Sequence, residues 1–217
     1  MEVKVCGMRD ADNVRQVARL GIDIMGFIFY PKSPRCVCKP IPRTEYDINV
    51  TRVGVFVNEK LDVILNKVME YGLDAVQLHG NESRALCLEL SKYMVSSHFE
   101  YGKLVGDRLR IYKAISVATA DDIQKYKEYA GAVDLFLFDT KCKTVGGSGQ
   151  QFDWSVLEQY DGDVPFLLSG GIGPEDAERI KNFHHPKCVG IDLNSKFEIE
   201  PGLKDVSKLK EFLEKIK

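Results

Sequence analysis

The sequence lacks an apolar run long enough to cross a bilayer. The longest one, residues 24–30, falls far short of the ~20 residues that a transmembrane helix needs. The first residues contain no basic segment followed by an apolar one, so no secretory signal is visible. An excess of one charge is also lacking, since 30 Lys and Arg face 32 Asp and Glu for a net charge of −2. These absences predict a cytoplasmic protein that binds neither membranes nor nucleic acids.

Cysteine is present but lacks the spacing of a metal site or a disulfide framework. The six cysteines are scattered, and none belongs to a CxxC pair. Cys36 and Cys38 flank a single residue, which is not a usual zinc spacing, and no histidine stands nearby. Disulfide frameworks are typical of secreted chains shorter than this one of 217 residues. We therefore expect no bound metal and no disulfide framework.

Short apolar segments alternate with amphipathic ones along the whole chain, and no linker rich in Pro, Ser or Gly divides it. Nearly all-apolar strands are typical of a parallel sheet covered on both faces, and their alternation with helices indicates the α/β class. The pattern predicts a single (β/α)8 TIM barrel over residues 1–217, with an open doubly wound sheet as the alternative. The expected strands are residues 3–6, 22–29, 52–57, 75–78, 111–115, 133–138, 165–168 and 189–193.

The segments between these strands carry helical signals of differing strength. Residues 61–68 have apolar side chains at the i, i+3, i+4 and i+7 spacing of an amphipathic helix, and Asp10 suits the N-cap of an earlier helix. Residues 40–48 are poorly patterned, and residues 93–108 indicate a hairpin or a loop. Further helices are expected near residues 121–129, 154–160, 174–183 and 206–216.

In a barrel of this kind, the working residues gather at the carboxyl ends of the strands. The loop after the seventh expected strand suits an anion, because Gly170 and Gly171 let backbone N–H groups approach it without hindrance. A helix start at Pro174 would add the positive end of a helix dipole. We predict a phosphate site here, and a loop that merely turns tightly is the alternative.

Three side chains at other strand ends suit acid–base chemistry and carboxylate binding. Cys6 would act as a base if its pKa were lowered, and inert packing is the alternative. Asp139 leaves an apolar strand, where a poorly solvated carboxyl suits a general acid; a helix cap or an ion pair with Lys141 is the alternative. Arg35 follows a rigid Pro-Lys-Ser-Pro segment and can hold a substrate carboxylate, although most arginines are simply solvated.

Several motifs occur in the order known from one family and span nearly the whole chain. They are KVCGMR (4–9), GFIFYPKSPR (26–35), VGVFVN (53–58), VQLHG (76–80), FDTK (138–141), GGSG (146–149), FDW (152–154), LSGGI (168–172) and GID (190–192). As a set, they resemble the phosphoribosylanthranilate isomerases of tryptophan biosynthesis.

The resemblance implies an Amadori rearrangement of N-(5-phosphoribosyl)anthranilate to 1-(2-carboxyphenylamino)-1-deoxyribulose 5-phosphate. The iminium of the substrate would serve as the electron sink, so no metal or organic cofactor is expected. Cys6 would be the general base, Asp139 the general acid, and Arg35 the residue that holds the anthranilate carboxylate. The resemblance further implies that the substrate contacts His79, Gly147, Ser148, Gly149, Gly170, Gly171, Asp192, Asn194 and Ser195.

Two positions depart from the family pattern near the expected phosphate site. Lys196 stands where the family has a flexible glycine, and Gln150 stands where a basic residue often follows the GGSG motif. The other barrels weighed are indole-glycerol-phosphate synthase, which uses Lys and Glu, and the histidine-pathway ProFAR isomerase, which has an aspartate in place of Cys6. A catalytically inactive phosphate-binding barrel is the alternative from another class. A monomer is expected because no long exposed apolar stripe is visible, with a homodimer as the alternative.

Overall fold

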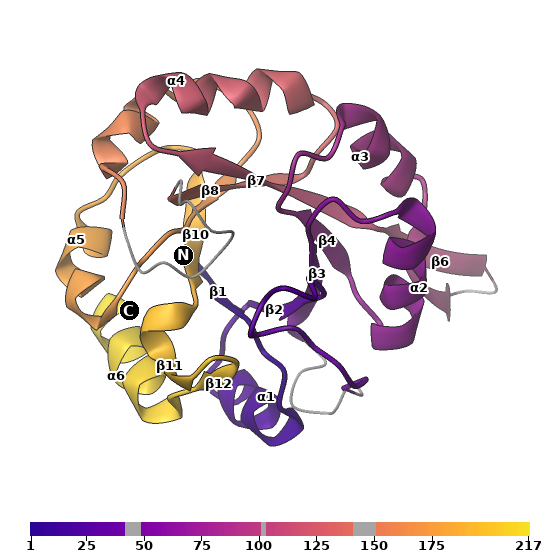
Figure 1. Cartoon of the computed structure of the whole chain (residues 1–217), viewed down its shortest axis with the longest axis horizontal. Helices are drawn as coiled ribbons and strands as arrows, with labels where there is room; N and C mark the ends of the chain where they lie inside the picture. The colour runs from indigo at the N-terminus through magenta and orange to yellow at the C-terminus, as the bar shows by residue number, and fades with distance from the viewer. Residues whose placement is uncertain (42–48, 101–102, 141–150) are drawn as a thin grey trace.

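Eight parallel strands close into a barrel, and the helices lie around its outside (Figure 1). The structure is a computed structural model that describes residues 1–41, 49–100, 103–140 and 151–217. The strand order around the barrel is β1-β10-β9-β8-β7-β4-β3-β2. Because β1 pairs in parallel with both β2 and β10, the sheet has no free edge. The predicted (β/α)8 barrel is therefore confirmed, and the open-sheet alternative is wrong.

The eight barrel strands match the eight apolar segments to within two residues at each end, which is the ordinary variation of strand boundaries. Asp23, for example, lies before β2 rather than in it, because its carboxylate accepts the backbone N–H of Val3. The strands are β1 (Glu2–Cys6), β2 (Ile24–Ile28), β3 (Thr51–Phe56), β4 (Ala75–Leu78), β7 (Arg110–Val117), β8 (Leu135–Thr140), β9 (Phe166–Leu168) and β10 (Cys188–Leu193).

Side chains alternate between two apolar layers along each strand, as the pleat of a strand requires. On β8, Phe136 and Phe138 pack in the outer layer between the sheet and the helices, whereas Leu135 and Leu137 belong to the inner cluster. The inner cluster consists of Ile24, Val53, Ala75, Tyr112, Ala114, Leu135, Leu137 and Leu167. This register decides which side chains at the strand ends face the barrel interior.

The helices expected near residues 121–129, 154–160 and 174–183 are short and wholly or partly 3₁₀, whereas those at residues 61–71 and 206–216 cover their expected ranges. Asp10 caps α1 as predicted by accepting the N–H of Asn13. The expected helix near residues 154–160 is a 3₁₀ helix that stops where Tyr160 becomes extended and packs its ring on Phe138 and Phe166. The helices are α1 (Ala11–Ala18), α2 (Leu61–Tyr71), α3 (Arg84–Leu90), α4 (Ala120–Ile123), α5 (Ala177–Lys181) and α6 (Val206–Ile216), and the 3₁₀ helices are η1 (Gln124–Tyr129), η2 (Trp154–Gln159), η3 (Pro174–Asp176) and η4 (Ser195–Phe197).

Two antiparallel hairpins lie outside the barrel. The pair β5 (Met94–Glu100) and β6 (Lys103–Arg108) precedes β7, which confirms the hairpin interpretation of residues 93–108. The pair β11 (Glu198–Glu200) and β12 (Leu203–Lys204) follows β10 and was not predicted. Most of the poorly patterned segment 40–48 lies outside the described residues. In the described part of the chain, no helix is long and apolar enough to span a membrane.

Candidate active site

Polar and titratable side chains occupy the interior positions at the carboxyl ends of several barrel strands. Val3 and Val5 pack in the outer layer, so Cys6, which alternates with them on β1, faces the interior. The same alternation places Asp139 of β8 and Asp192 of β10 on the interior side. The further polar residues at this end are Gln77, His79 and Ser169. The carboxyl end of the barrel is therefore a polar mouth, as the sequence predicts.

Asp139 is held by a short chain of hydrogen bonds. The Oδ2 atom of Asp139 lies 3.1 Å from Nε2 of His79, and Nδ1 of His79 lies 2.8 Å from Nε2 of Gln77. The backbone N–H of Thr140 donates to Oδ1 of Asp139 at 2.8 Å. When the Gln77 amide donates to Nδ1, the Nε2 atom of His79 carries the proton and donates to Asp139. His79 thus fixes the position of the carboxyl group.

Gly170 brings the loop after β9 directly against Asp139. Its φ of +92° lies in the left-handed region, and a Cβ built there would lie 2.9 Å from Oδ1 of Asp139 and would also overlap Thr140. Gly171 follows with a φ of +68°. Within the described residues, no hydrogen bond is donated by the N–H groups of Gly171 or Ser195. The loops after β9 and β10 therefore present backbone N–H groups at the mouth, from which an anion can accept hydrogen bonds.

The start of η3 contributes less to such an anion site than its sequence predicts. The N–H of Gly173, just before Pro174, already donates to the carboxylate of Asp176 at 2.7 Å. A buried carboxylate at this helix start uses the donor that a phosphate would otherwise use. Lys196 is exposed on η4. The residues Gly147, Ser148 and Gly149, predicted to bind substrate, and Lys141, the alternative partner of Asp139, lie outside the described residues.

Cys6 is 4% exposed and lies beside buried charges. Burial raises the pKa of the Cys6 thiol above its ordinary value, although the ammonium groups of Lys4 and Lys204 act in the opposite direction. The lowered pKa on which a role of Cys6 as a base depends is not found in this structure, because the loss of solvation outweighs the nearby positive charge. The thiol is the favoured form in this structure at neutral pH.

Lys4 and Asp192 form a fully buried ion pair inside the barrel. Nζ of Lys4 lies 2.9 Å from Oδ1 of Asp192, and the Ser169 hydroxyl donates to Oδ2 at 3.1 Å. Burial alone would lower the pKa of Lys4, but Asp192 and Cys6 raise it above its ordinary value. Both carboxylate oxygens of Asp192 thus have protein partners. Sequence reasoning missed Lys4, although a lysine inside an apolar strand is a visible signal.

Arg35 is not a solvated surface arginine. Its Nε atom lies 2.9 and 3.0 Å from the two carboxylate oxygens of Glu198, and its Nη2 lies 2.7 Å from Oε2. Lys204 approaches the same carboxylate from β12, with Nζ 2.6 Å from Oε1. The side chains of Arg35, Glu198 and Lys204 are 10%, 4% and 0% exposed. Sequence reasoning missed Glu198 and Lys204, which reach the mouth only through the β11–β12 hairpin.

The chain turns at Gly7 so that this charged cluster lies against the end of β1. Gly7 has a φ of +80°, and a Cβ there would lie 2.8 Å from both Cδ of Arg35 and Oδ1 of Asn194. The same Asn194 side chain accepts a hydrogen bond from Lys204 at 2.8 Å. Arg35 and Asn194, both predicted to contact substrate, therefore lie beside the residue that follows Cys6.

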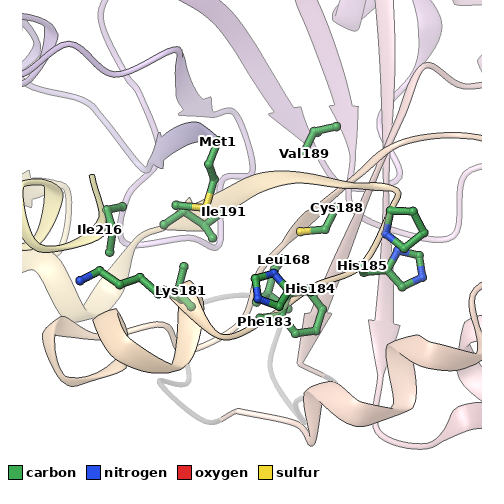
Figure 2. Close-up of a pocket in the computed structure, with 12 residues that line it drawn as sticks. Met1, Leu168, Lys181, Phe183, His184, His185, Cys188, Val189, Ile191 and Ile216 are labelled. Carbon is green, nitrogen blue, oxygen red and sulfur yellow. The ribbon is translucent and has the colours of Figure 1, made fainter.

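Other features of the molecule lie away from this mouth. A cavity of about 740 Å³ lies beside the amino ends of β1 and β10, where Met1, Cys188 and Ile216 are among its lining residues (Figure 2). Among the described residues, no group of three His, Cys, Asp or Glu side chains is arranged to hold a metal ion.

The closed parallel barrel and its polar mouth together define a TIM-barrel enzyme. Its side chains can donate and accept protons at the carboxyl ends of the strands. The sequence profile described as "N-(5'phosphoribosyl)anthranilate (PRA) isomerase" matches residues 3–215. The chain belongs to the N-(5'-phosphoribosyl)anthranilate isomerase family, whose members are isomerases of tryptophan biosynthesis.

Curated relatives and solved structures of this family match the chain over its full length. An N-(5'-phosphoribosyl)anthranilate isomerase of Parabacteroides distasonis is 49% identical, and the match covers 100% of this chain and 93% of that protein. The same enzyme of Phocaeicola vulgatus is 43% identical, with 100% and 98% covered. The crystal structure of phosphoribosyl anthranilate isomerase from Thermotoga maritima has a TM-score of 0.77 at 30% identity, with 100% and 98% covered.

Proposed function

We propose that this chain isomerises N-(5-phosphoribosyl)anthranilate with Cys6 as the general base and Asp139 as the general acid. The observation that carries the proposal is the shared interior register of the two residues at the same end of the barrel. If the Cys6 thiol and the Asp139 carboxyl group lay at opposite ends of the molecule, this proposal would be excluded. A related isomerase, with a TM-score of 0.75 and 28% identity, was crystallised in complex with reduced 1-(o-carboxyphenylamino)-1-deoxyribulose 5-phosphate, which supports this substrate class.

The first step opens the ribose ring. Asp139 donates its proton to the ring oxygen, the bond between that oxygen and C1′ breaks, and the nitrogen lone pair forms an iminium with C1′. His79 can accompany either protonation state of Asp139, because an unprotonated oxygen of either the carboxylate or the carboxylic acid can accept from Nε2–H. The carboxyl group therefore keeps its place while its proton leaves.

The second step removes the C2′ proton, which the iminium makes acidic. Cys6 takes this proton as a thiolate, and the electron pair of the C–H bond neutralises the iminium to give an enolamine. The enolamine then takes a proton at C1′ from the Cys6 thiol and loses its C2′ hydroxyl proton to the Asp139 carboxylate, which gives the ketone and returns both groups to their starting forms. The ammonium groups of Lys4 and Lys204 favour the thiolate that this step needs, against the effect of burial.

The ends of the substrate would be held on either side of these two groups. Arg35 holds the anthranilate carboxylate, and the N–H groups of Gly171 and Ser195 contribute to the phosphate site. Gly147, Ser148 and Gly149 stay part of the proposal on sequence grounds. Asp192 acts indirectly in this scheme, because Lys4 and Ser169 already occupy its carboxylate oxygens.

Turnover of freshly prepared N-(5-phosphoribosyl)anthranilate, followed through the loss of its fluorescence, tests the proposal. An inactive phosphate-binding barrel would bind the reduced product analogue named above and show no turnover. That outcome, with the wild-type chain folded, would refute the enzymatic role.

A monomer in the cytoplasm is the assembly and location that we infer. The large exposed apolar side chains of the described residues are scattered over several elements: Met1, Met69, Tyr93, Met94 and Ile199. A solved relative is described as "mutually generated monomers" of a dimeric isomerase from Thermotoga maritima, so the homodimer is the alternative. Light scattering after gel filtration, over a range of protein concentrations, decides between the two states.

A further inference from the structure

The ion pair between Arg35 and Glu198 poses an electrostatic problem for binding an anion. Glu198 engages Nε and Nη2 of Arg35 at 2.7 to 3.0 Å, and the Glu198 side chain is 4% exposed. An arginine that is fully paired with a buried carboxylate forms a neutral unit, which attracts a second carboxylate only weakly. The Glu198 carboxylate that holds Arg35 in place thus also neutralises the positive charge with which Arg35 would attract a substrate carboxylate.

Lys204 resolves this problem because it adds a second positive charge to the same carboxylate. Its Nζ lies 2.6 Å from Oε1 of Glu198, and the Gly202 N–H donates to the same oxygen at 3.0 Å. Burial raises the pKa of Glu198, but Arg35 and Lys204 outweigh it and hold this pKa below its ordinary value. Burial lowers the pKa of Lys204 below its ordinary value of 10.5, although Glu198 acts in the opposite direction. With Lys204 protonated, two cations and one carboxylate give the cluster a net charge of +1.

The geometry also leaves one edge of the guanidinium for a ligand. Glu198 occupies the edge formed by Nε and Nη2, while Nη1 of Arg35 makes no hydrogen bond to the described part of the chain. Cδ of Arg35 lies 2.8 Å from a Cβ built on Gly7, so this side chain lies beside the residue that follows Cys6. A carboxylate that accepts from Nη1 would therefore bind next to the end of β1.

We propose that Glu198 and Lys204 determine the specificity for the substrate carboxylate. Glu198 orients Arg35, and Lys204 neutralises Glu198 so that the cluster keeps a net positive charge. Both residues are positioning residues that act through Arg35. The inference rests on the proposed function, since it takes the anthranilate carboxylate as the ligand of Arg35.

The test compares two probes by isothermal titration calorimetry. One is the reduced product analogue, reduced 1-(o-carboxyphenylamino)-1-deoxyribulose 5-phosphate, and the other is the same compound without its ring carboxyl group. Lys204→Met should weaken binding of the first probe by about tenfold or more, because a charge that supports a carboxylate contact is lost. Binding of the second probe should change by less than about threefold, since it contacts only the remainder of the site.

A double variant separates charge from structure. Glu198→Gln combined with Lys204→Met removes one negative and one positive charge, so the cluster again has a net charge of +1. The double variant should therefore bind the carboxylate probe more tightly than Lys204→Met alone. Lys208→Met is the matched control, because Lys208 pairs with Asp205 at 3.9 Å outside the cluster and is 39% exposed. It should bind both probes as the wild type does.

Three outcomes are distinguishable. Selective loss for the carboxylate probe, with recovery in the double variant, supports the inference. Equal weakening of both probes in Lys204→Met, or no recovery in a double variant that circular dichroism shows to be folded, overturns it and assigns Lys204 a structural role through Asn194. Failure of the wild type to bind either probe overturns the proposed function itself, and the inference with it.

Discussion

Cys6 lies among three buried charges that act on it in opposite directions. Lys4 is two residues earlier on the same interior face of β1, and its ion pair with Asp192 brings a carboxylate close as well. Lys204 adds positive charge from β12. Burial outweighs these charges and raises the pKa of the thiol, so the thiolate that removes a proton is a minor form in this structure.

Cys6→Ser tests the role of this thiol directly. A serine hydroxyl has nearly the same shape but is a far weaker acid, so its conjugate base is not accessible near neutral pH. We expect kcat to fall by about a thousandfold or more, while the dissociation constant of the reduced product analogue stays within about threefold. Near-normal turnover in the fluorescence assay would remove Cys6 from the mechanism.

Asp139→Asn tests the acid. The amide keeps the size of the side chain but cannot deliver a proton to the ring oxygen, so kcat should fall by about a hundredfold or more. Asp163→Asn serves as the control for the same chemical change, since the Asp163 side chain is fully exposed. Stopped-flow turnover of both variants is the measurement. Equal rates for Asp139→Asn and the control would exclude Asp139 as the acid.

The sequence predicts the end of each strand more reliably than the partners found there. Cys6 and Asp139 follow apolar segments, so strand counting alone places both of them at the mouth. Arg35 was expected at the rim, but its ion pair with Glu198 joins positions 163 residues apart, and no local pattern reveals such a contact. Lys4 itself stands out as a lysine inside an apolar strand, but its partner Asp192 lies 188 residues away, so no local pattern reveals their ion pair.

At the scale of elements, Gly170 lets the loop after β9 pack closely against the end of β8. Gly170→Ala should lower the free energy of unfolding by about 2 kcal/mol and reduce kcat, because the residue has a φ of +92° and its Cβ would overlap Thr140 and crowd Asp139. Gly21→Ala is the matched control, since Gly21 has a φ of +72° with nothing within 4 Å of a built Cβ. It should lose about 1 kcal/mol and keep its activity.

Urea unfolding and steady-state kinetics measure the two effects separately. If Gly21→Ala and Gly170→Ala lost the same stability and both kept full activity, backbone strain alone would explain the cost. The close contact between Gly170 and Asp139 would then have no effect on activity.

The sequence predicts the type of an element where its apolar pattern is clear. The prediction fails where a short element has no such pattern. All eight barrel strands were predicted, because each is an apolar segment bounded by polar or turn-forming residues. The β11–β12 hairpin was missed, since its strands consist of three and two residues around a Pro201-Gly202 turn. That turn is the signal that could have found it. The 3₁₀ character of η2 depends on how Tyr160 packs, which periodicity does not describe.

At the scale of the whole molecule, the barrel separates its chemistry from much of its stabilising structure. The polar mouth lies at the carboxyl ends of the strands, whereas aromatic and apolar side chains fill the layer between strands and helices. Tyr129 belongs to that outer layer. Its hydroxyl donates to the Glu82 carbonyl at 2.8 Å, and its ring lies under the Lys113 ammonium.

The stability of the fold at alkaline pH should depend on Tyr129. Burial raises the pKa of Tyr129 to about 12 from an ordinary value of 10.0, because the charged phenolate is poorly solvated there. A raised pKa in the folded state contributes stability that is complete below about pH 10 and is lost as the pH rises through about 12. Around pH 11 the loss amounts to about 1 kcal/mol. Tyr129→Phe cannot ionise, so its stability should fall less over this window.

Urea unfolding of the wild type and of Tyr129→Phe, at pH 7 and around pH 11, measures this difference. The variant also loses the hydrogen bond to Glu82, which lowers its stability by a similar amount at both pH values. That offset cancels when each protein is compared with itself. The other groups that titrate in this range, including Lys113 with its lowered pKa and Cys87 with a pKa of about 11, are present in both proteins. Parallel losses of stability in the two proteins would show that Tyr129 ionises as freely in the fold as in the unfolded chain.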